Sequence, residues 1–246
     1  MTTIRDFREL LKPIVARRGD LHSFNRYVIF VSIRAGFKGL LLDRSSTREE
    51  FDARQIARPL CVMSEGCPMG WEMGMGRPGT QTYREAFPNY RFYKPEQLDK
   101  LVTHPWLTTD PDFPEGLRDA IENKMLAELK DISTLREFAD WTNRNHAADS
   151  FDYAQCAVLV EPALGNFSEA ARLLSVPHGK LLHREFDAWL PGLGDRLEAM
   201  GDDLPLADKR AIVAMLHARE AAVIKSLKLE KFWQPAPFPA EELGLV

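Results

Sequence analysis

The chain has 246 residues, of which 45% are hydrophobic and 28% charged, a balance typical of a globular protein and not of a disordered one. Its net charge of −4 gives no electrostatic reason to expect binding to nucleic acid or to an anionic membrane. No apolar run approaches the ~20 residues of a membrane-spanning helix, and no signal peptide is recognisable. Three cysteines without a disulfide framework favour a reducing compartment, so we expect a cytoplasmic protein.

The order of the predicted elements indicates an α+β fold. An antiparallel sheet of about four strands near the N-terminus, flanked by one helix, is followed by an all-helical C-terminal part. The length suits a single compact domain over residues 1–246. Within it, residues 1–113 contain the first helix, the sheet and an irregular aromatic loop, and residues 114–246 are helical.

The first helix and the first of two hairpins lie at the start of the chain. Apolar residues three and four apart predict a helix over residues 3–18, which Pro13 should kink or end near Lys12. Residues 27–33 are nearly all apolar or β-branched, as in a central strand. Residues 37–43 are predicted to return antiparallel after a glycine turn.

The second hairpin is predicted over residues 55–63 and 70–76. Pro59 lies inside the third strand, which favours an edge position or a bulge there. In the fourth strand, apolar residues alternate with glycines, so one face carries large side chains and the other is nearly bare. A bare face lets another backbone or a ligand come close.

Beyond the sheet, the chain is expected to be irregular up to residue 114, except for a short helix over residues 95–102. Periodic apolar residues then predict helices near residues 117–129, 135–142, 153–164, 168–174, 179–199 and 208–229. Gly165 suits the left-handed end of one helix, and Asn166 suits the N-cap of the next. Trp233 and Phe238 are expected to anchor the proline-rich tail.

A cluster of sulfur-containing residues is the most unusual chemistry in the sequence. Thiolates and thioethers bind Cu(I), and thiolates bind Zn(II), so Cys61, Met63, Cys67 and Met69 are candidate metal ligands. The spacing of the two cysteines differs from the C-x2-C pattern of a zinc knuckle. Methionine and buried cysteine are also ordinary core residues. We therefore predict neither a metal nor another cofactor.

A second candidate site lies on the longest predicted helix. Glu220 falls within the apolar face of this helix, and His217 lies at its edge three residues earlier, so the two side chains can meet. A carboxylate in an apolar stripe must be paired, hydrogen-bonded or protonated. This pair could be a general base or a metal ligand. Alternatively, Glu220 could be the buried partner of an arginine or lie in a hydrated interface between helices.

The strand over residues 70–76 and the aromatic loop after it form a candidate binding surface. Aromatic side chains anchor interfaces at low entropic cost, and a glycine-lined face permits close approach. The candidate binding residues are Trp71, Glu72, Tyr83, Phe87, Tyr90 and Tyr93. The alternative is that these rings cover the sheet as part of the core.

The sequence contains no nucleophile elbow, phosphate-binding loop or zinc-protease motif. We therefore expect a protein-binding module, of the kind found among bacterial immunity proteins, adaptors and chaperones, whose partner is another protein. The alternative is a small hydrolase-like enzyme with a pocket between sheet and helices. The pattern does not predict the oligomeric state.

Overall fold

The computed structural model describes residues 4–24, 27–44, 50–63, 75–76, 106–107, 115, 118–119, 121–145, 151–175, 183, 187–188 and 191–246. The chain forms two compact units that alternate along the sequence. Unit 1 comprises Met1–Ser32, Lys38–Ala57 and Met75–Ile132, and unit 2 comprises Ile33–Phe37, Arg58–Gly74 and Ser133–Val246. The expectation of a single domain stays a prediction.

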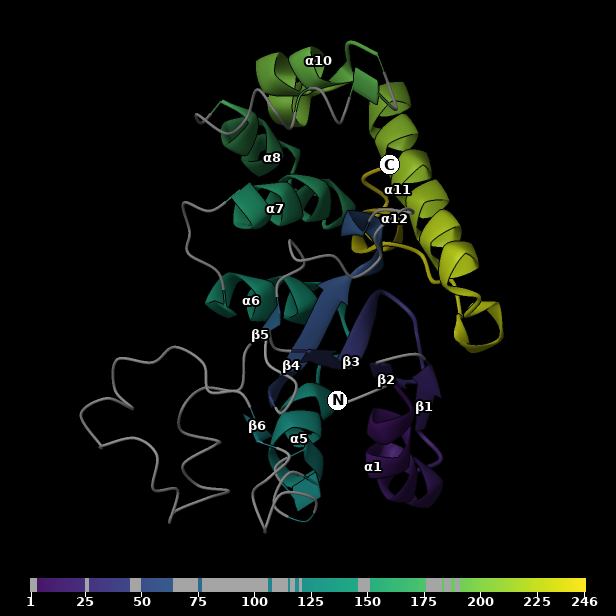
Figure 1. The fold of residues 1–246 in the computed structure, drawn as a ribbon. Coiled ribbons are helices and arrows are strands. Elements are labelled where there is room, and N and C mark those ends of the chain that lie inside the picture. The colour runs from purple at the N-terminus through teal and green to yellow at the C-terminus, as the bar shows by residue number, and fades with distance from the viewer. Residues whose placement is uncertain are drawn as a thin grey trace, which may run out of the picture. The chain divides into compact units, whose positions relative to one another are not determined.

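An antiparallel sheet near the N-terminus is followed by helices, which confirms the predicted α+β fold (Figure 1). The strands are β1 (Leu21–Phe24), β2 (Tyr27–Phe30), β3 (Gly36–Arg44), β4 (Glu50–Pro59), β5 (Met75–Gly76) and β6 (Trp106–Leu107). Their order in the sheet is β1-β2-β3-β4-β5, and β6 also pairs with β4.

The first predicted hairpin is present. β2 and β3 are antiparallel, with Tyr27 opposite Leu41 and Ile29 opposite Gly39. β1, which the sequence pattern does not predict, pairs with β2 and has only four residues, two of them polar. Such a short strand gives no alternation long enough to detect.

The third strand was predicted too far along the chain. β4 ends at Pro59, and the buried residues Leu60–Val62 form a 3-10 turn, η1. Proline lacks the N–H that would continue the ladder, so the apolar run after it is buried without being a strand. Of the predicted fourth strand, Met75 and Gly76 are described, and they pair antiparallel with Ile56 and Gln55.

Unit 1 also contains the first helix, α1 (Ile4–Arg17). Pro13 lies inside α1, so the alternative of a helix ending near Lys12 is wrong. Further along, a π-helical turn, η2 (Ile121–Met125), leads into α5 (Leu126–Lys130). The Gln55 side chain donates to the Met125 carbonyl oxygen at 3.0 Å, which joins β4 to the end of η2.

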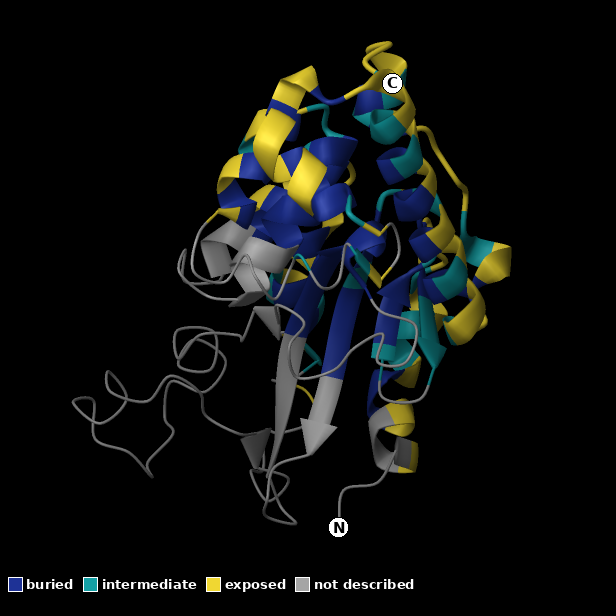
Figure 2. Cartoon of the chain, turned by 90° about the horizontal axis from the view of Figure 1, so that it is seen from above, coloured by how far each residue is buried: buried dark blue, intermediate teal, exposed yellow. Residues whose placement is uncertain are grey.

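Unit 2 is mostly helical. Its elements are α6 (Leu135–Asn145), α7 (Phe151–Ala163), α8 (Phe167–Leu174), α10 (Leu193–Met200), η3 (Gly201–Asp203), α11 (Leu206–Leu227), η4 (Glu230–Phe232) and α12 (Pro239–Glu242). Helices α6, α7, α8 and α10 are stacked in that order, and the long α11 runs beside them (Figure 1). Apolar residues from these helices and from η1 form one core, and the helices turn their exposed faces outward (Figure 2).

The turn between α7 and α8 follows the prediction. Gly165 has a φ of +90°, which a residue with a Cβ rarely adopts. The Gly165 N–H donates to the Pro162 carbonyl and the Asn166 N–H to the Glu161 carbonyl, as in a Schellman motif. The Asn166 side chain makes no capping bond to α8, because its amide donates to Glu161 instead.

The C-terminal segment 233–246 packs on other parts of unit 2. Trp233 forms an isolated parallel bridge with Ile33, and the Gln234 N–H donates to the Ile33 carbonyl at 2.9 Å. Phe238 is buried, which confirms its predicted anchoring role, whereas Trp233 is half-buried.

Candidate functional site

A partly buried group of three ionisable residues joins α11 to α12. The α11–α12 polar cluster consists of His217, Glu220 and Glu241. His217 Nδ1 lies 3.4 Å from Glu220 Oε2, and His217 Nε2 lies 2.8 Å from Glu241 Oε2. The imidazole therefore has a carboxylate at each of its nitrogens.

Glu220 is buried, with 2% of its side chain exposed, as the helical pattern predicted. Among the residues that the structure describes, its partner is His217 on its own helix rather than the expected group from another helix. Among the described residues, Glu220 Oε1 has no hydrogen-bond partner. Burial raises the pKa of Glu220, although the bond to His217 acts in the opposite direction.

The two carboxylates favour the charged form of the histidine between them. The bond to Glu220 raises the pKa of His217, partial burial lowers it, and the bond to Glu241 raises it again, with a net rise. Burial raises the pKa of Glu241, but the bonds from His217 and from the Phe238 N–H outweigh it and leave this pKa lowered. The cluster can hold a proton on the imidazole more firmly than an isolated histidine can.

Local sequence places Glu241 at the start of α12. Phe238 is the N-cap of this short helix, Pro239 follows it, and Glu241 accepts the Phe238 N–H at 2.7 Å. Proline at the first helical position and glutamate at the third are preferred at helix starts. The Phe238 ring also stacks on the His217 ring, with centroids 4.2 Å apart.

The buried Arg219 joins the same helix to η1. Its Nε donates to the Cys61 carbonyl oxygen at 2.9 Å, and its Nη2 lies 3.4 Å from the Met63 carbonyl oxygen. These carbonyls follow Pro59, where the strand ladder has ended, so the guanidinium supplies donors that the sheet no longer provides. Arg219 therefore fixes η1 and Met63 against α11 within unit 2.

The sulfur residues that the structure describes are core residues. Cys61 and Met63 are buried, and Cys156 of α7 is a second buried cysteine. Burial raises the pKa of Cys61 well above its ordinary value, so this thiol is a poor source of thiolate. Within the described part of the chain, no group of three histidine, cysteine or acidic residues could hold a metal ion. Cys67 and Met69 lie outside the described residues.

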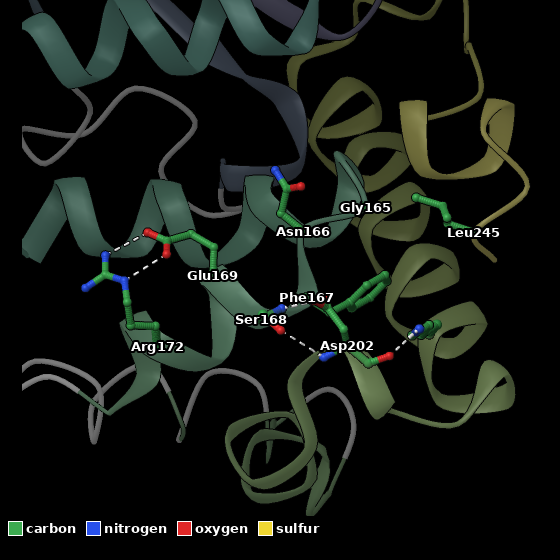
Figure 3. Close-up of a pocket in the computed structure, with 9 residues that line it drawn as sticks. Gly165, Asn166, Phe167, Ser168, Glu169, Arg172, Asp202 and Leu245 are labelled. Carbon is green, nitrogen blue, oxygen red and sulfur yellow. Dashed lines mark hydrogen bonds and ion pairs between the residues drawn. The ribbon is translucent and has the colours of Figure 1, made fainter.

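A pocket of about 570 Å³ lies at the turn between α7 and α8 (Figure 3). It is lined by Gly165, Asn166, Phe167, Ser168, Glu169, Arg172, Asp202, Lys209 and Leu245. The Arg172 guanidinium binds both carboxylate oxygens of Glu169 at 2.7 Å at one side of the pocket, and Leu245 lies at the other (Figure 3).

A reciprocal pair of hydrogen bonds joins Ser168 and Asp202, both of which line this pocket. The Ser168 N–H donates to Asp202 Oδ1 at 2.9 Å, and the Asp202 N–H donates to Ser168 Oγ at 3.2 Å. Asp202 thus caps α8 from η3, and the bonds from Ser168 lower its pKa. Lys209 Nζ donates to the Asp202 carbonyl and lies over the Phe167 ring.

The sequence pattern predicts only some of the residues in these sites. The proposed surface residues Trp71, Glu72, Tyr83, Phe87, Tyr90 and Tyr93 all lie outside the described residues. The pattern does not predict that Glu241, Arg219 and Asp202 belong to these sites. The proline and glutamate at the start of α12 were a signal for Glu241, whereas no local pattern reveals that Asp202 caps a helix 34 residues earlier.

No helix among the described residues is long and apolar enough to span a membrane. The chain matches no protein-family model, no curated protein and no solved structure.

Proposed function

We propose that this chain is a protein-binding module, of immunity, adaptor or chaperone type, which takes a segment of its partner at the pocket between α7 and α8. The observation that carries the proposal is the combination in one pocket of an exposed leucine with charged groups of both signs. Interfaces of this kind bury apolar side chains at the centre and leave charged groups at the rim.

The exposed apolar residues support this location. Leu245 lines the pocket, and Leu243 precedes it by two residues. Met200 and Leu206 flank the η3 segment that supplies Asp202 to the pocket. These are the large hydrophobic residues that the described part of the chain exposes. Exposed apolar groups that gather near one pocket are typical of a protein-binding surface.

The charged groups suit a partner segment that is itself polar at its ends. Arg172 and Glu169 form an exposed ion pair. Because such a pair contributes little to stability, either residue can instead pair with a charged group of the partner at a small free-energy cost. Lys209 keeps its ammonium over the Phe167 ring while its stem covers apolar surface. The partner segment is therefore expected to present an apolar side chain between charged neighbours.

Site-specific crosslinking tests this proposal. A photoreactive residue in place of Asn166, which is exposed and lines the pocket, is expected to capture a protein partner in the source cell. Mass spectrometry identifies the partner, and titration with the purified partner measures its affinity. Leu245→Asp is expected to weaken that affinity at least tenfold without lowering the melting temperature, because Leu245 is exposed.

The matched control places the same photoreactive residue at Ala218, which is exposed on α11 and does not line the pocket. Equal capture from both positions would contradict the proposal, as would a partner affinity that Leu245→Asp leaves unchanged.

The proposal also includes the cellular compartment of the protein and a second contact surface, formed by aromatic residues. We propose a cytoplasmic location, supported by the buried free thiol of Cys61, which a reducing compartment maintains. The aromatic surface with Trp71, Glu72, Tyr83, Phe87, Tyr90 and Tyr93 remains a second proposed contact area for the same partner.

One observation favours the alternative of a hydrolase-like enzyme. His217 is partly exposed and lies between two carboxylates, an arrangement that can take up and release a proton near neutral pH. This candidate predicts an esterase-type activity that His217→Gln abolishes and His183→Gln retains. Partner binding without such activity would exclude it.

A further inference from the structure

The C-terminal segment 233–246, here called the strap, packs on other parts of unit 2, and an ionisable residue of the strap is hydrogen-bonded to α11. Phe238 and Ala240 of the strap are buried, and the strap helix α12 packs on α7. A side-chain hydrogen bond joins the strap to α11, with His217 Nε2 2.8 Å from Glu241 Oε2, which accepts it when that nitrogen carries a proton. The Phe238 ring is stacked on the same imidazole.

The strength of this tie depends on the protonation of His217. A protonated imidazole can donate from both nitrogens, to Glu220 and to Glu241, and presents a positive charge to the face of the Phe238 ring. A neutral imidazole has a single N–H. One of its nitrogens then turns a lone pair toward a carboxylate oxygen, and the charge-assisted part of both bonds is lost.

We propose that the C-terminal segment 233–246 is a pH-dependent strap, which is held on α11 while His217 is protonated between Glu220 and Glu241 and loosens when His217 becomes neutral. This device stands apart from the proposed binding function, since it concerns the isolated protein. It also reaches the pocket between α7 and α8, because Leu245 of the strap lines that pocket.

The charged groups around His217 are few among the described residues. Glu220 faces it from α11 and Glu241 from α12. Arg219 points to the carbonyl oxygens of Cys61 and Met63 in η1. On α7, Glu161 is bonded to Arg136 and to the Asn166 amide.

The direction of the pH response follows from these groups. The pKa of His217 is raised in the folded protein, so its contribution to strap attachment is complete at low pH and is lost as pH rises through that raised value. The pKa of Glu241 is lowered, so its contribution is lost only as pH falls through that lowered value. Attachment is therefore strongest between these two values and weakens as pH rises through the raised value of His217.

Hydrogen exchange reports on strap attachment through α12, because a helix of four residues is not stable once its packing on the rest of the protein is lost. The amides of Glu242, Leu243 and Leu245 donate to the carbonyls of Phe238, Pro239 and Ala240 and report on the strap. Their protection factors, corrected for intrinsic exchange, are expected to fall roughly tenfold as pH rises from about 6 to about 9. In His217→Gln, the protection is expected to be low and independent of pH.

A second variant keeps the test decisive if His217→Gln disturbs the fold. Glu220→Gln removes the largest contribution to the raised pKa of His217, so the midpoint of the strap transition should move to lower pH. The control is His183→Gln, which removes another histidine–glutamate bond of 2.8 Å away from the strap and should leave the transition unchanged. Protection that does not vary with pH, or a midpoint that Glu220→Gln does not move, would overturn the proposal.

Discussion

Two histidines of unit 2 have nearly the same partners and differ in how far those partners reach water. His217 lies between Glu241, at 2.8 Å, and Glu220, at 3.4 Å. His183 lies between Glu198, at 2.8 Å, and Asp195, at 3.5 Å. The side chain of Glu220 is 2% exposed, whereas that of Asp195 is 82% exposed.

The same contrast extends from the histidines to the other charged groups of unit 2. Arg219 and Glu220 lie on the buried face of α11, whereas the ion pairs on α8 and α10 are open to solvent. Water screens the charges of an exposed ion pair, which then contributes less than about 1 kcal/mol to folding stability. A buried polar group that loses its partner has no water molecule to replace the lost hydrogen bond. Equal distances therefore do not mean equal contributions to stability.

The largest effect is expected for Arg219→Ala. This change leaves the buried carbonyl oxygens of Cys61 and Met63 without their charged donor. Hydrogen bonds to charged groups contribute about 1.5–3 kcal/mol each, so we expect a loss of about 3 kcal/mol or more in the free energy of unfolding, measured with urea. Arg172→Ala, on the exposed face of α8, is the control and should cost under about 1 kcal/mol. Equal losses in the two variants would remove the distinction between the buried and exposed groups.

A smaller loss is expected for Glu220→Leu. The apolar side chain fits the buried face of α11 but leaves His217 Nδ1 without its acceptor, which should cost about 1–3 kcal/mol at neutral pH. Glu220→Gln keeps an acceptor oxygen and should be tolerated better. Greater stability of the leucine variant than of the glutamine variant would show that relief from burying a charge matters more than the hydrogen bond.

Glu137 is an exposed carboxylate whose removal should still be measurable. It accepts the backbone N–H groups of Ser133 and Thr134 at the start of α6, both at 2.8 Å, and these bonds lower its pKa to about 2. Glu137→Ala is expected to cost about 1 kcal/mol, as for other helix caps.

The sign of its pH dependence follows from the lowered pKa. The contribution of Glu137 is complete above the ordinary glutamate value of 4.5 and disappears as pH falls toward about 2. The difference in unfolding free energy between Glu137→Ala and the unmodified protein should therefore shrink over this interval. A difference that stays constant would mean that the carboxylate charge does not act on the helix start.

The smallest effect is expected for His183→Gln. The His183 side chain is 15% exposed, but its bonds go to two carboxylates that water also reaches, so the change in unfolding free energy should remain under about 1 kcal/mol. Urea unfolding at neutral pH measures it beside His217→Gln. A loss as large as that of His217→Gln would show that exposure of the partners is not what separates the two sites.

The sequence was sufficient for features that depend on local chemistry. The β2–β3 hairpin, the positive φ of Gly165 and the burial of Glu220 within an apolar helical face all follow from patterns within a few residues. The end of β4 was misplaced because Leu60, Cys61 and Val62 are as apolar as a strand, although Pro59 had already ended the ladder.

The candidate site was harder to predict because most of its contacts join distant parts of the chain. His217 and Glu220 are three residues apart and share a helix face, so their contact could be inferred. Glu241 meets His217 from 24 residues away, and Arg219 meets Cys61 across 158 residues. Periodicity carries no information about such pairs; only the packing of helices in three dimensions brings them together.

The bridge between Ile33 and Trp233 has a consequence for the order of events during synthesis on the ribosome. The Ile33 N–H donates to the Phe232 carbonyl, and the Gln234 N–H donates to the Ile33 carbonyl, so residues made early are bonded to residues made 200 positions later. Unit 1 has all its residues once Ile132 has been added. Unit 2 instead combines Ile33–Phe37 with Ser133–Val246, which are synthesised much later. In the nascent chain Ile33 therefore lacks these backbone partners until about 200 further residues have been added, and contacts of such long sequence separation form slowly.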